Sequence, residues 1–244
     1  MNFYTFANKI RYRVLPNLKY LPQSSFRRCQ CCLKPSLIIS FSDGEEFKLC
    51  IRCRANLRYE MLAMMFRKYC SDLSSKVIVE LDHNSPLSKQ FMGSNNYIKT
   101  YYSASTSVGF VNGAGLRCED ITQTSFNDSS VDVIISSDVL EHVSNIETAF
   151  KETKRILKNG GFHIFTVPPR PKTIKRAEFV EGKTRLFMEP DYHSDPLNPE
   201  GILAYWDFGV DAIELFSKSG LDVSIIDGPK GKDGRLVWMA KKPY

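Results

Sequence analysis

Four of the seven cysteines stand in two pairs that have the spacing of a metal site. Cys29 and Cys32 form one C-x2-C pair, and Cys50 and Cys53 form a second pair after 17 intervening residues. Two such pairs supply the four thiolates that tetrahedral zinc prefers in a closed, structural site. The sequence therefore predicts a bound zinc ion, although Cys31 could replace Cys32 as a ligand. The alternative is a set of reduced, metal-free thiols, because disulfides need an oxidising compartment.

The residues around these cysteines divide the start of the chain into two parts. Between the pairs, two strand-like runs flank the turn sequence SDGE, which is a hairpin signal. We therefore expect a small zinc-ribbon-like module at residues 26–56, after a basic N-terminal segment at residues 1–25. Residues 1–42 contain seven Lys or Arg residues and no acidic residue. Such a segment suits nucleic acid, an anionic membrane surface, or packing on its own domain.

The composition is that of an ordinary globular protein. The chain of 244 residues is 43% hydrophobic and 25% charged, and its formal net charge is +6. This length suffices for one α/β domain with a small appendage. No apolar run approaches the ~20 residues that a transmembrane helix needs, and the N-terminus lacks the apolar core of a signal peptide. We expect a cytoplasmic protein, with peripheral contact at the inner face of the membrane if the basic segment binds lipid.

From residue 57 onward, strand-like and helical runs alternate. One helical pattern covers residues 56–69, and another begins at Ser144, which has capping-box spacing to Glu147, and ends at Gly160 and Gly161. Alternation of this kind predicts an α/β domain with a mainly parallel sheet and helices on both faces. The strand-like runs are residues 76–82, 96–103, 115–121, 131–139, 161–169, 221–226 and 234–242.

Residues 126–169 resemble the central block of class I S-adenosylmethionine-dependent methyltransferases. The motifs are NDSSVD before a strand, VLEHV at a helix entrance and RILKNGG before the next strand. The resemblance implies a Rossmann-like fold with a seven-stranded, mainly parallel sheet over residues 57–244. A subgroup with an N-terminal cysteine-pair module and a YHxxP…DxG segment is most similar, since residues 192–209 read YHSDPLNPEGILAYWDFG. Such proteins resemble bacterial enzymes of surface-glycan and secondary-metabolite pathways.

The resemblance also implies S-adenosylmethionine as the cofactor, held at the ends of several strands. After the first strand the family has Gly-x-Gly, where this chain has Asp82 and Asn84, residue types that tolerate left-handed backbone conformations. The acid that usually binds both ribose hydroxyls is absent, so Tyr102 or Ser103 would make a single hydrogen bond there. Asp120 stands where the family's carboxylate accepts from the adenine amino group. The implied cofactor-binding residues are Glu80, Leu81, Asp82, Asn84, Tyr102, Ser103, Asp120, Ile121, Ser137 and Asp138.

Residues 170–206 are expected to form a lid over the acceptor site. Basic residues of this segment stand beside carboxylates and a histidine, a mixture that suits an anionic acceptor. His193 is the first choice for the general base, because imidazole titrates near working pH, and Asp191 or Asp195 would orient it. His142, at the helix entrance, completes the candidate catalytic set. Each histidine could instead be structural, His193 by tethering the lid and His142 by capping or packing.

These expectations lead to one preferred function and two alternatives. The preferred function is O-methylation of a sugar hydroxyl or an acidic group of a surface glycan or its precursor. Nucleic-acid methylation is the first alternative, which the zinc module and basic segment support. It is opposed by SSDV at residues 136–139, where base-methylating relatives carry an Asn/Asp-Pro-Pro-aromatic motif. The second alternative is a non-catalytic binding module with a decayed cofactor site, because the glycines and the ribose acid are missing.

Overall fold

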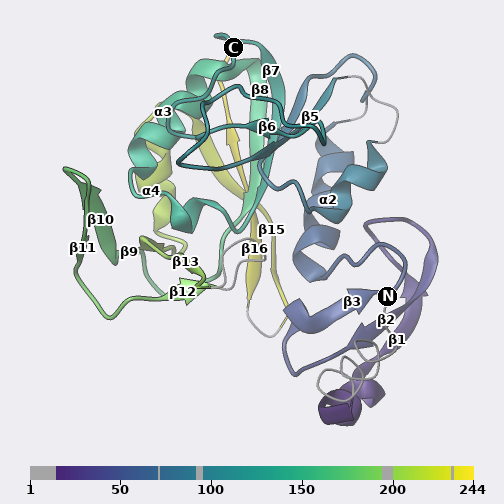
Figure 1. The fold of residues 1–244 in the computed structure, drawn as a ribbon. Helices are drawn as coiled ribbons and strands as arrows, with labels where there is room; N and C mark the ends of the chain where they lie inside the picture. Colours follow the sequence, from purple (N-terminus) through teal and green to yellow (C-terminus); the bar gives the residue numbers. More distant parts are fainter. Residues whose placement is uncertain (1–14, 71, 92–95, 194–199, 232–233) are drawn as a thin grey trace.

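A seven-stranded sheet forms the centre of the molecule (Figure 1). The computed structural model describes residues 15–70, 72–91, 96–193, 200–231 and 234–244, so most of the predicted basic segment lies outside the described residues. The strand order is β15-β16-β8-β7-β4-β5-β6. These strands are β4 (Ile78–Glu80), β5 (Tyr97–Tyr101), β6 (Arg117–Cys118), β7 (Val131–Ser137), β8 (Leu157–Thr166), β15 (Asp222–Lys230) and β16 (Arg235–Lys241).

The sheet is mainly parallel, as the sequence predicts. The pairs β5–β6, β4–β5, β4–β7 and β7–β8 are parallel, and β16 runs antiparallel to both of its neighbours. The central strand β7 is buried along its whole length. Val133 and Ile135 belong to the core on one face, and Ile134 belongs to the core on the other, as a strand buried on both faces requires. The Rossmann-like fold is therefore confirmed.

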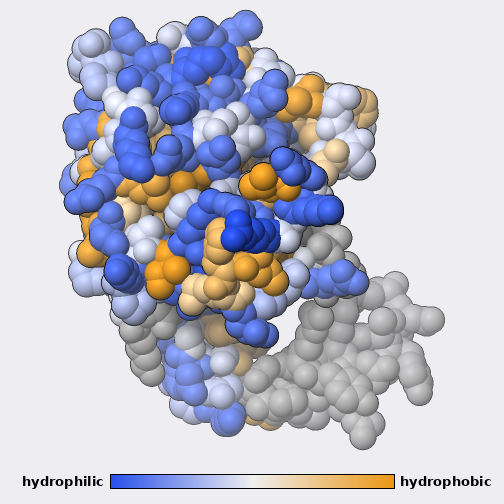
Figure 2. Space-filling model, turned by 90° about the vertical axis from the view of Figure 1, so that its left-hand side faces the viewer, coloured by the Kyte–Doolittle hydropathy of each residue, from blue (hydrophilic) through white to orange (hydrophobic). Residues whose placement is uncertain are grey.

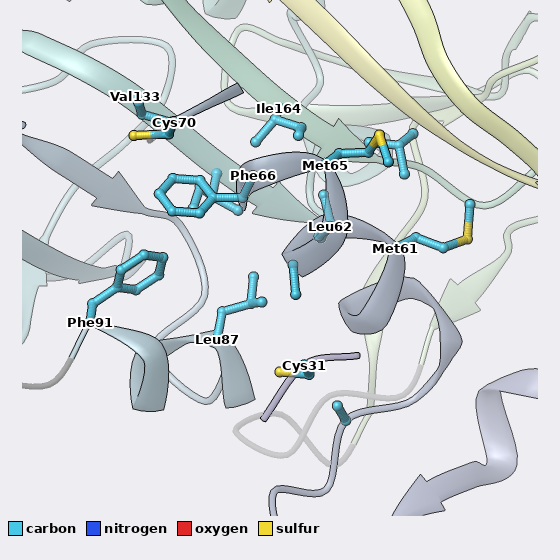
Figure 3. Packing of buried hydrophobic residues seen from close by; sticks show 14 of the residues in the cluster. Cys31, Met61, Leu62, Met65, Phe66, Cys70, Leu87, Phe91, Val133 and Ile164 are labelled. Carbon is cyan, nitrogen blue, oxygen red and sulfur yellow. The ribbon is translucent and has the colours of Figure 1, made fainter. Parts of the chain in front are cut away.

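Helices cover both faces of this sheet (Figure 1). Helix α2 (Leu57–Tyr69) lies on one face, where Phe66 packs among the residues of the core that includes Val133 (Figure 3). Helices α3 (Ile146–Ile156) and α4 (Ala212–Ser217) lie on the other. There, Phe150 stacks on Phe216 with 4.6 Å between the ring centroids. The sheet therefore lies between two cores, each made of aromatic and aliphatic side chains.

The start and end of α3 differ from the expectation. The N-cap is Asn145 rather than Ser144, and its side-chain oxygen accepts from Thr148 N at 3.1 Å. An Asn side chain caps a helix as well as a Ser does, so the cap lies one residue later. The helix ends at Ile156, and β8 follows directly. Gly160 has a positive φ of 76° inside β8, where its amide bonds to the chain after β16, and it does not end the helix.

Short 3-10 helices occur in several connections. The described part of the β4–β5 connection holds only such a helix, and the β5–β6 connection at residues 102–116 holds none, because it is rich in Ser and Gly. The longest helix in the described ranges, α2, has 13 residues, so none of them could cross a bilayer. The 3-10 helices are η2 (Leu15–Gln23), η3 (Glu45–Phe47), η4 (Pro86–Gln90) and η5 (Leu140–His142).

A separate antiparallel sheet precedes the main one. Its strands, in the order β1-β2-β3, are β1 (Ser25–Arg28), β2 (Pro35–Ser40) and β3 (Lys48–Cys50). Glu60 of α2 joins this sheet to the body, because its carboxylate accepts from Arg27 at 2.6 and 2.9 Å and from Gln30 N at 2.8 Å. Arg67 donates in return to the Gln30 carbonyl at 2.5 Å. Helix α2 therefore connects the small sheet to the main sheet.

Residues 170–206, the predicted lid, contain small two-stranded sheets. Strand β10 pairs with β11 in a hairpin that projects from the body, β12 pairs with β13, and β9 pairs with β14 (Figure 1). The strands are β9 (Ile174–Lys175), β10 (Ala177–Val180), β11 (Lys183–Leu186), β12 (Tyr192–His193), β13 (Ile202–Leu203) and β14 (Trp206–Asp207). The described part of this segment contains no helix, so β-pairing fixes where its side chains lie.

Candidate active site

The candidate site lies at the carboxyl ends of β4 and β7, where the strand order reverses. The chain leaves β4 toward β5 on one side of it, whereas β7 pairs with β4 on the other side. In open α/β sheets, ligands bind outside the carboxyl ends of the strands at such a switch point. The residues that follow these strands are therefore the ones that could meet a cofactor.

The loop after β4 is closed by side chains instead of by glycines. Asp82 Oδ1 accepts from Asn84 N at 2.9 Å, and Asp82 Oδ2 accepts from the Tyr59 hydroxyl at 2.5 Å. Neither Asp82 nor Asn84 has a positive φ, so the loop does not use the left-handed conformation that these residue types tolerate. The Asp82 side chain forms an Asx turn, which bends the chain without a left-handed residue. Leu81 N donates to Ile135 O at 2.9 Å and ties the start of the loop to β7.

Glu80, at the end of β4, is only 1% exposed. Its carboxylate accepts a hydrogen bond from the Tyr97 hydroxyl. Burial raises the pKa of Glu80 from 4.5 to about 7, although hydrogen bonds from Ser85 and Tyr97 oppose the rise. Near neutral pH this side chain is therefore partly protonated. Its polar contacts are internal, and its predicted contact with the cofactor stays a prediction.

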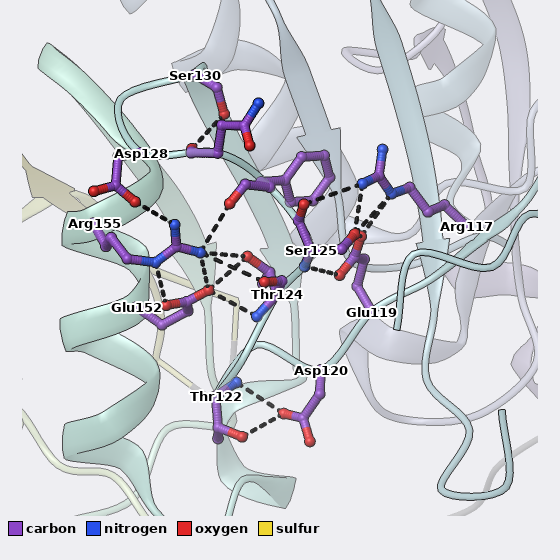
Figure 4. A network of polar contacts seen from close by, with 12 residues as sticks. Arg117, Glu119, Asp120, Thr122, Thr124, Ser125, Asp128, Ser130, Glu152 and Arg155 are labelled. Carbon is purple, nitrogen blue, oxygen red and sulfur yellow. Dashed lines mark hydrogen bonds and ion pairs between the residues drawn. The ribbon is translucent and has the colours of Figure 1, made fainter. Parts of the chain in front are cut away.

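The predicted ribose position after β5 holds hydroxyl groups. Tyr102 is 65% exposed, and the Ser103 hydroxyl contacts hydroxyl groups of its own loop. An acidic residue, Glu119, directly follows the next strand, β6. It is buried and accepts from Arg117 Nε at 2.6 Å and from Ser125 N at 2.8 Å (Figure 4). Glu119 thus holds its own loop together. Tyr102 and Ser103 remain the predicted ribose contacts.

Asp120 keeps one carboxylate oxygen available. Its Oδ1 accepts from Thr122 N at 2.8 Å and from the Thr122 hydroxyl at 2.7 Å, which fixes the side chain (Figure 4). Within the described residues, Oδ2 has no hydrogen-bond partner. Ile121 beside it is buried, 7% exposed, and belongs to the core under α3. A fixed carboxylate with one unused oxygen matches the predicted adenine contact, which stays a prediction.

Asp138, directly after β7, is held by two arginines. Arg58 donates to it at 2.5 Å, Arg235 donates at 2.9 Å, and the Thr166 hydroxyl donates at 2.8 Å. Burial alone would raise the pKa of the Asp138 carboxyl, but Arg58 and Arg235 outweigh it and hold that pKa below its usual range. Asp138 also has a φ of 52°. The neighbouring Ser137 hydroxyl is buried and has no hydrogen-bond partner in the described structure.

Sequence reasoning missed the part that α2 plays at this site. Arg58 and Tyr59, in its first turn, contact Asp138 and Asp82, the residues after β7 and β4. Asn56 caps the helix by accepting from Tyr59 N at 3.4 Å, which sets where this turn begins. The Asn cap was the available signal, because it shows which residues stand in the first turn of the helix. What they contact is decided by how α2 docks on the sheet.

Three side chains from separate segments meet beyond β7. Glu141 and His142 belong to η5, and His193 belongs to β12. His142 Nε2 and His193 Nδ1 each lie 3.7 Å from Glu141 Oε1, and the two imidazole rings are 4.9 Å apart at 83°. The Glu141 side chain is 2% exposed, and neither of its oxygens has a hydrogen-bond partner in the described residues. The structure thus brings His142 and His193 together and adds Glu141, which the sequence analysis did not single out.

Backbone contacts of the lid assemble this cluster. Tyr205 N donates to Glu141 O at 2.8 Å, and Ala204 N donates to Asp191 O at 2.8 Å. Asp191 Oδ2 lies 3.7 Å from His193 Nε2 and 2.9 Å from Arg170. Asp191 therefore lies beside His193, and its orienting role stays a prediction, whereas Asp195 lies outside the described residues.

The protonation states of the cluster are coupled. Burial raises the pKa of the Glu141 carboxyl. The Glu141 carboxylate raises the pKa of His193, although burial opposes that rise. The pKa values of the two groups are therefore set by burial and by the proximity of the two side chains.

The outer face of the lid is apolar and basic. Phe179, Val180 and Phe187 are between 45% and 54% exposed on or beside the β10–β11 hairpin. Figure 2 looks onto this side of the molecule, where hydrophobic and charged side chains lie next to one another. A cavity of about 220 Å³ opens between the hairpin and the start of α3, lined among others by Lys175 and Trp206. This cavity lies on the outer side of the lid, away from the loop after β4.

The four paired cysteines of the small sheet come together. Sulfur atoms of Cys29 and Cys53 are 3.6 Å apart, those of Cys32 and Cys50 are 4.0 Å apart, and all four lie within 4.8 Å of one another. Cys32 belongs to this group of four sulfurs and Cys31 does not, so the structure selects Cys32 for the cluster. Four ligands 2.3 Å from a tetrahedral zinc ion would have sulfurs about 3.8 Å apart. The donor set and its spacing fit zinc.

The two cysteine pairs have the same backbone turn. Leu33 follows the first pair with a φ of 58°, and Arg54 follows the second with a φ of 69°. Leu33 N donates to Cys29 O at 2.9 Å, and Arg54 N donates to Cys50 O at 2.7 Å. Left-handed conformations are unfavourable for such side chains, so two of them at matching positions mark a constrained turn. Each turn aims its two sulfur atoms at one point.

Comparisons with known proteins bear on the body of the chain. Residues 94–165 match the family model described as a methyltransferase domain. The match begins after the β4 loop, where the glycines of the family are missing. A search of curated proteins finds no match.

Several solved structures are similar to this chain. One is an S-adenosylmethionine dependent methyltransferase from Mesorhizobium loti, with 13% identity, 75% of this chain and 97% of that chain covered, and a TM-score of 0.49. Another is the 1,6-didemethyltoxoflavin-N1-methyltransferase of Burkholderia thailandensis, with 12% identity, 75% and 77% coverage, and a TM-score of 0.47. A third is phosphoethanolamine N-methyltransferase 2 of Haemonchus contortus, with 11% identity, 76% and 53% coverage, and a TM-score of 0.47.

The strand order and the sequence match agree with each other. Six strands that run in one direction, the reversal between β4 and β7, and the antiparallel β16 make up the sheet expected from the resemblance. The matched segment covers β5 to β8, the middle of that sheet. The chain has the Rossmann-like fold of class I S-adenosylmethionine-dependent methyltransferases, and residues 94–165 match the model of a methyltransferase domain.

Proposed function

We propose that the protein transfers a methyl group from S-adenosylmethionine to an oxygen of a small-molecule or glycan acceptor, such as a sugar hydroxyl or an acidic group of a surface glycan or its precursor. The observation that carries this proposal is the cluster of Glu141, His142 and His193 beyond the carboxyl end of β7. A base beside the cofactor's reactive end is what a hydroxyl acceptor needs. Arg170 and Arg176, at the root of the lid, both pair with Asp207, so an anionic acceptor would have to share these two arginines with that carboxylate.

The reaction requires alignment and the removal of one proton. The acceptor oxygen forms a bond to the methyl carbon, while the carbon–sulfur bond breaks and its electron pair goes to the positively charged sulfur. The acceptor hydroxyl loses its proton, and we propose that His193 takes it, which is supported by an imidazole that is partly exposed and faces Glu141. Asp191 would orient the ring from the other side, and His142 would complete the set.

Residues around the switch point would hold the cofactor. Asp120, with one unused oxygen, would accept from the adenine amino group, and the buried Ser137 hydroxyl would contact the methionine part. Asp138 is already paired with Arg58 and Arg235, so its proposed contribution to cofactor binding is indirect, through the shape of the site. The remaining proposed contacts are Glu80, Leu81, Asp82, Asn84, Tyr102, Ser103 and Ile121.

Calorimetric titration with S-adenosylmethionine and S-adenosylhomocysteine tests the cofactor. We expect micromolar binding, weakened about tenfold by Asp120→Ala through the loss of one hydrogen bond to the adenine. Glu214→Ala on the exposed surface of α4 is the control and should leave the affinity unchanged. No binding at millimolar ligand would contradict the proposal, and an unchanged affinity of Asp120→Ala would contradict the adenine contact.

An acceptor screen that starts with acidic sugars tests the chemistry. His193→Ala should abolish turnover while cofactor affinity stays within a few-fold of the parent protein. Loss of folding or of cofactor binding in this variant would instead make His193 a structural residue. Turnover of nucleic acid but not of sugars would favour the alternative acceptor class.

One observation favours the non-catalytic alternative. Tyr59 and Arg58 already contact Asp82 and Asp138, so the two loops nearest the methionine end of the proposed site are linked to α2. If these contacts persist in solution, no cofactor would enter. The same titration decides, because a decayed site would bind neither S-adenosylmethionine nor S-adenosylhomocysteine.

We further propose that the four-cysteine cluster holds a structural zinc ion. The spacing of Cys29, Cys32, Cys50 and Cys53 and the two matching turns support it. A closed set of four thiolates leaves no position for a substrate, so the ion would stabilise the small sheet. Metal analysis should find zinc in the parent protein. Cys32→Ser should lose one equivalent of zinc, whereas Cys31→Ser should retain it.

We also propose a cytoplasmic location, with the basic N-terminal segment as the part that could meet a membrane.

A further inference from the structure

We propose that Glu141, His142 and His193 bind a divalent transition-metal ion, separate from the ion at the cysteines. The site itself stands on its own geometry. Only its role, which is to bind the acceptor oxygen, rests on the proposed methyl transfer. Three arguments carry the inference: an uncompensated buried carboxylate, the distances between the donor atoms, and the groups that orient the two imidazoles.

The carboxylate of Glu141 lacks the compensation that burial demands. Its side chain is 2% exposed, and neither oxygen has a hydrogen-bond donor among the described residues. Buried carboxylates are normally paired, hydrogen-bonded or bound to a metal. The carboxylate of Asp138, close by in the chain, is satisfied by Arg58, Arg235 and Thr166, so those donors are already used. A cation between Glu141 and the histidines would supply what is missing.

The distances suit a shared ion better than direct hydrogen bonds. Both His142 Nε2 and His193 Nδ1 lie 3.7 Å from Glu141 Oε1, and the three donor atoms all lie within 4.8 Å of one another. A nitrogen–oxygen hydrogen bond is shorter, at about 2.7–3.2 Å. Two ligands about 2.1 Å from a tetrahedral ion lie about 3.4 Å apart. A small inward movement of the side chains would therefore complete the coordination.

Outer contacts turn one nitrogen of each imidazole toward the site. His142 Nδ1 lies 2.9 Å from Leu203 O, so it donates there and leaves the Nε2 lone pair facing Glu141. Asp191 faces His193 Nε2 at 3.7 Å, which leaves Nδ1 for the site. Carbonyl and carboxylate groups on the far nitrogen are the usual outer partners of metal-bound histidines.

The donor set indicates the class of ion. Two imidazole nitrogens and one carboxylate oxygen suit zinc, manganese, iron or cobalt in the divalent state, and they leave coordination positions open. The histidines are 16% and 27% exposed in their side chains, so a ligand from solvent can reach the ion. An acceptor hydroxyl bound there would lose its proton to solvent more easily, because the ion lowers its pKa. In that arrangement His193 is a ligand, and the ion takes over the activation of the hydroxyl.

Metal analysis and a manganese titration of the full-length protein test the site. We expect two zinc equivalents per chain in the parent protein after zinc reconstitution, and one in His193→Ala, in Glu141→Gln and in Cys32→Ser. His83→Ala, which changes a histidine outside both clusters, should retain two. Manganese is the second probe, because it prefers nitrogen and oxygen donors to thiolates. Its affinity should fall at least tenfold in Glu141→Gln and stay unchanged in Cys32→Ser.

The outcomes separate this inference from the proposed function. One zinc per chain in the parent protein, lost entirely in Cys32→Ser, together with no heat on manganese addition, would overturn the metal site. Glu141→Gln keeps the size of the side chain, so a loss of metal with an unchanged circular dichroism spectrum would reflect lost coordination and not misfolding. Cofactor titration is read independently. Metal binding without cofactor binding would overturn the methyl transfer alone, and cofactor binding without metal would overturn this inference alone.

Discussion

Two buried carboxylates at the end of β7 have opposite surroundings. Asp138 meets two arginines and a threonine hydroxyl at 2.5 to 2.9 Å. Glu141, three positions later, has no hydrogen-bond donor in the described part of the chain, and the nearest basic groups are two imidazoles at 3.7 Å. Both side chains are nearly inaccessible to water. The fold therefore satisfies one of these carboxylates with hydrogen bonds and leaves the other without any in the described residues.

The difference separates a structural role from a functional one. Asp138 connects α2, through Arg58, to β16, through Arg235, and so holds elements distant in sequence around the end of β7. Its charge is used within the fold. A carboxylate that the fold leaves unpaired costs stability, and such a cost persists where a ligand, metal or proton compensates it. The comparison predicts that neutralising these two carboxylates has effects of opposite sign.

The largest effect is expected from Asp138→Asn. The change leaves Arg58 and Arg235 without their counter-charge, and it should lower the free energy of unfolding by about 3–5 kcal/mol. Asn tolerates the φ of 52° at this position, so the backbone is not strained by the change. Urea denaturation measures the difference. Asp128→Asn removes a surface ion pair with Arg155 and is the control, at about 0–1 kcal/mol. Equal effects of Asp138→Asn and Asp128→Asn on the free energy of unfolding would contradict the structural role assigned to Asp138.

Glu80 gives the next effect, which appears as a pH dependence. Its pKa is raised from 4.5 to about 7 by burial, so the folded state binds a proton that the unfolded state has already released between these values. The free energy of unfolding should therefore fall as the pH rises from about 4.5 to about 7, by about 3 kcal/mol, and then level off. Glu80→Gln should remove this slope in urea denaturation curves recorded at several pH values. A slope that persists in the variant would assign it to another group.

The smallest effect is expected from Glu141→Gln. In protein that holds metal only at the cysteines, the change removes an unpaired buried charge and should raise the free energy of unfolding by about 1–3 kcal/mol. Urea denaturation with and without added manganese measures it. The parent protein should gain stability from manganese, and the variant should not. Destabilisation of the metal-free protein by this change would show that Glu141 has a structural partner, as Asp138 does.

Much of the fold is readable from short stretches of sequence. The strands of the main sheet follow from runs of β-branched and apolar residues, and their parallel arrangement follows from the alternation with helices. The spacing of the cysteine pairs predicts the four-sulfur cluster, because the two pairs are close in the chain and each turn is local. The choice between Cys31 and Cys32 required the structure, since it depends on which sulfur lies close to the other three.

Local sequence also determined which residue types stand at the strand ends, including Asp82, Asp120 and Asp138. Their contacts were decided by tertiary structure. Tyr59 reaches Asp82, and Arg58 reaches Asp138, only because α2 docks with its first turn over these loops. His193 meets Glu141 because the lid folds back and its backbone bonds to η5. Spacing along the chain encodes turns and periodic faces, whereas a contact between distant segments depends on how whole elements pack, and that information is spread over the entire sequence.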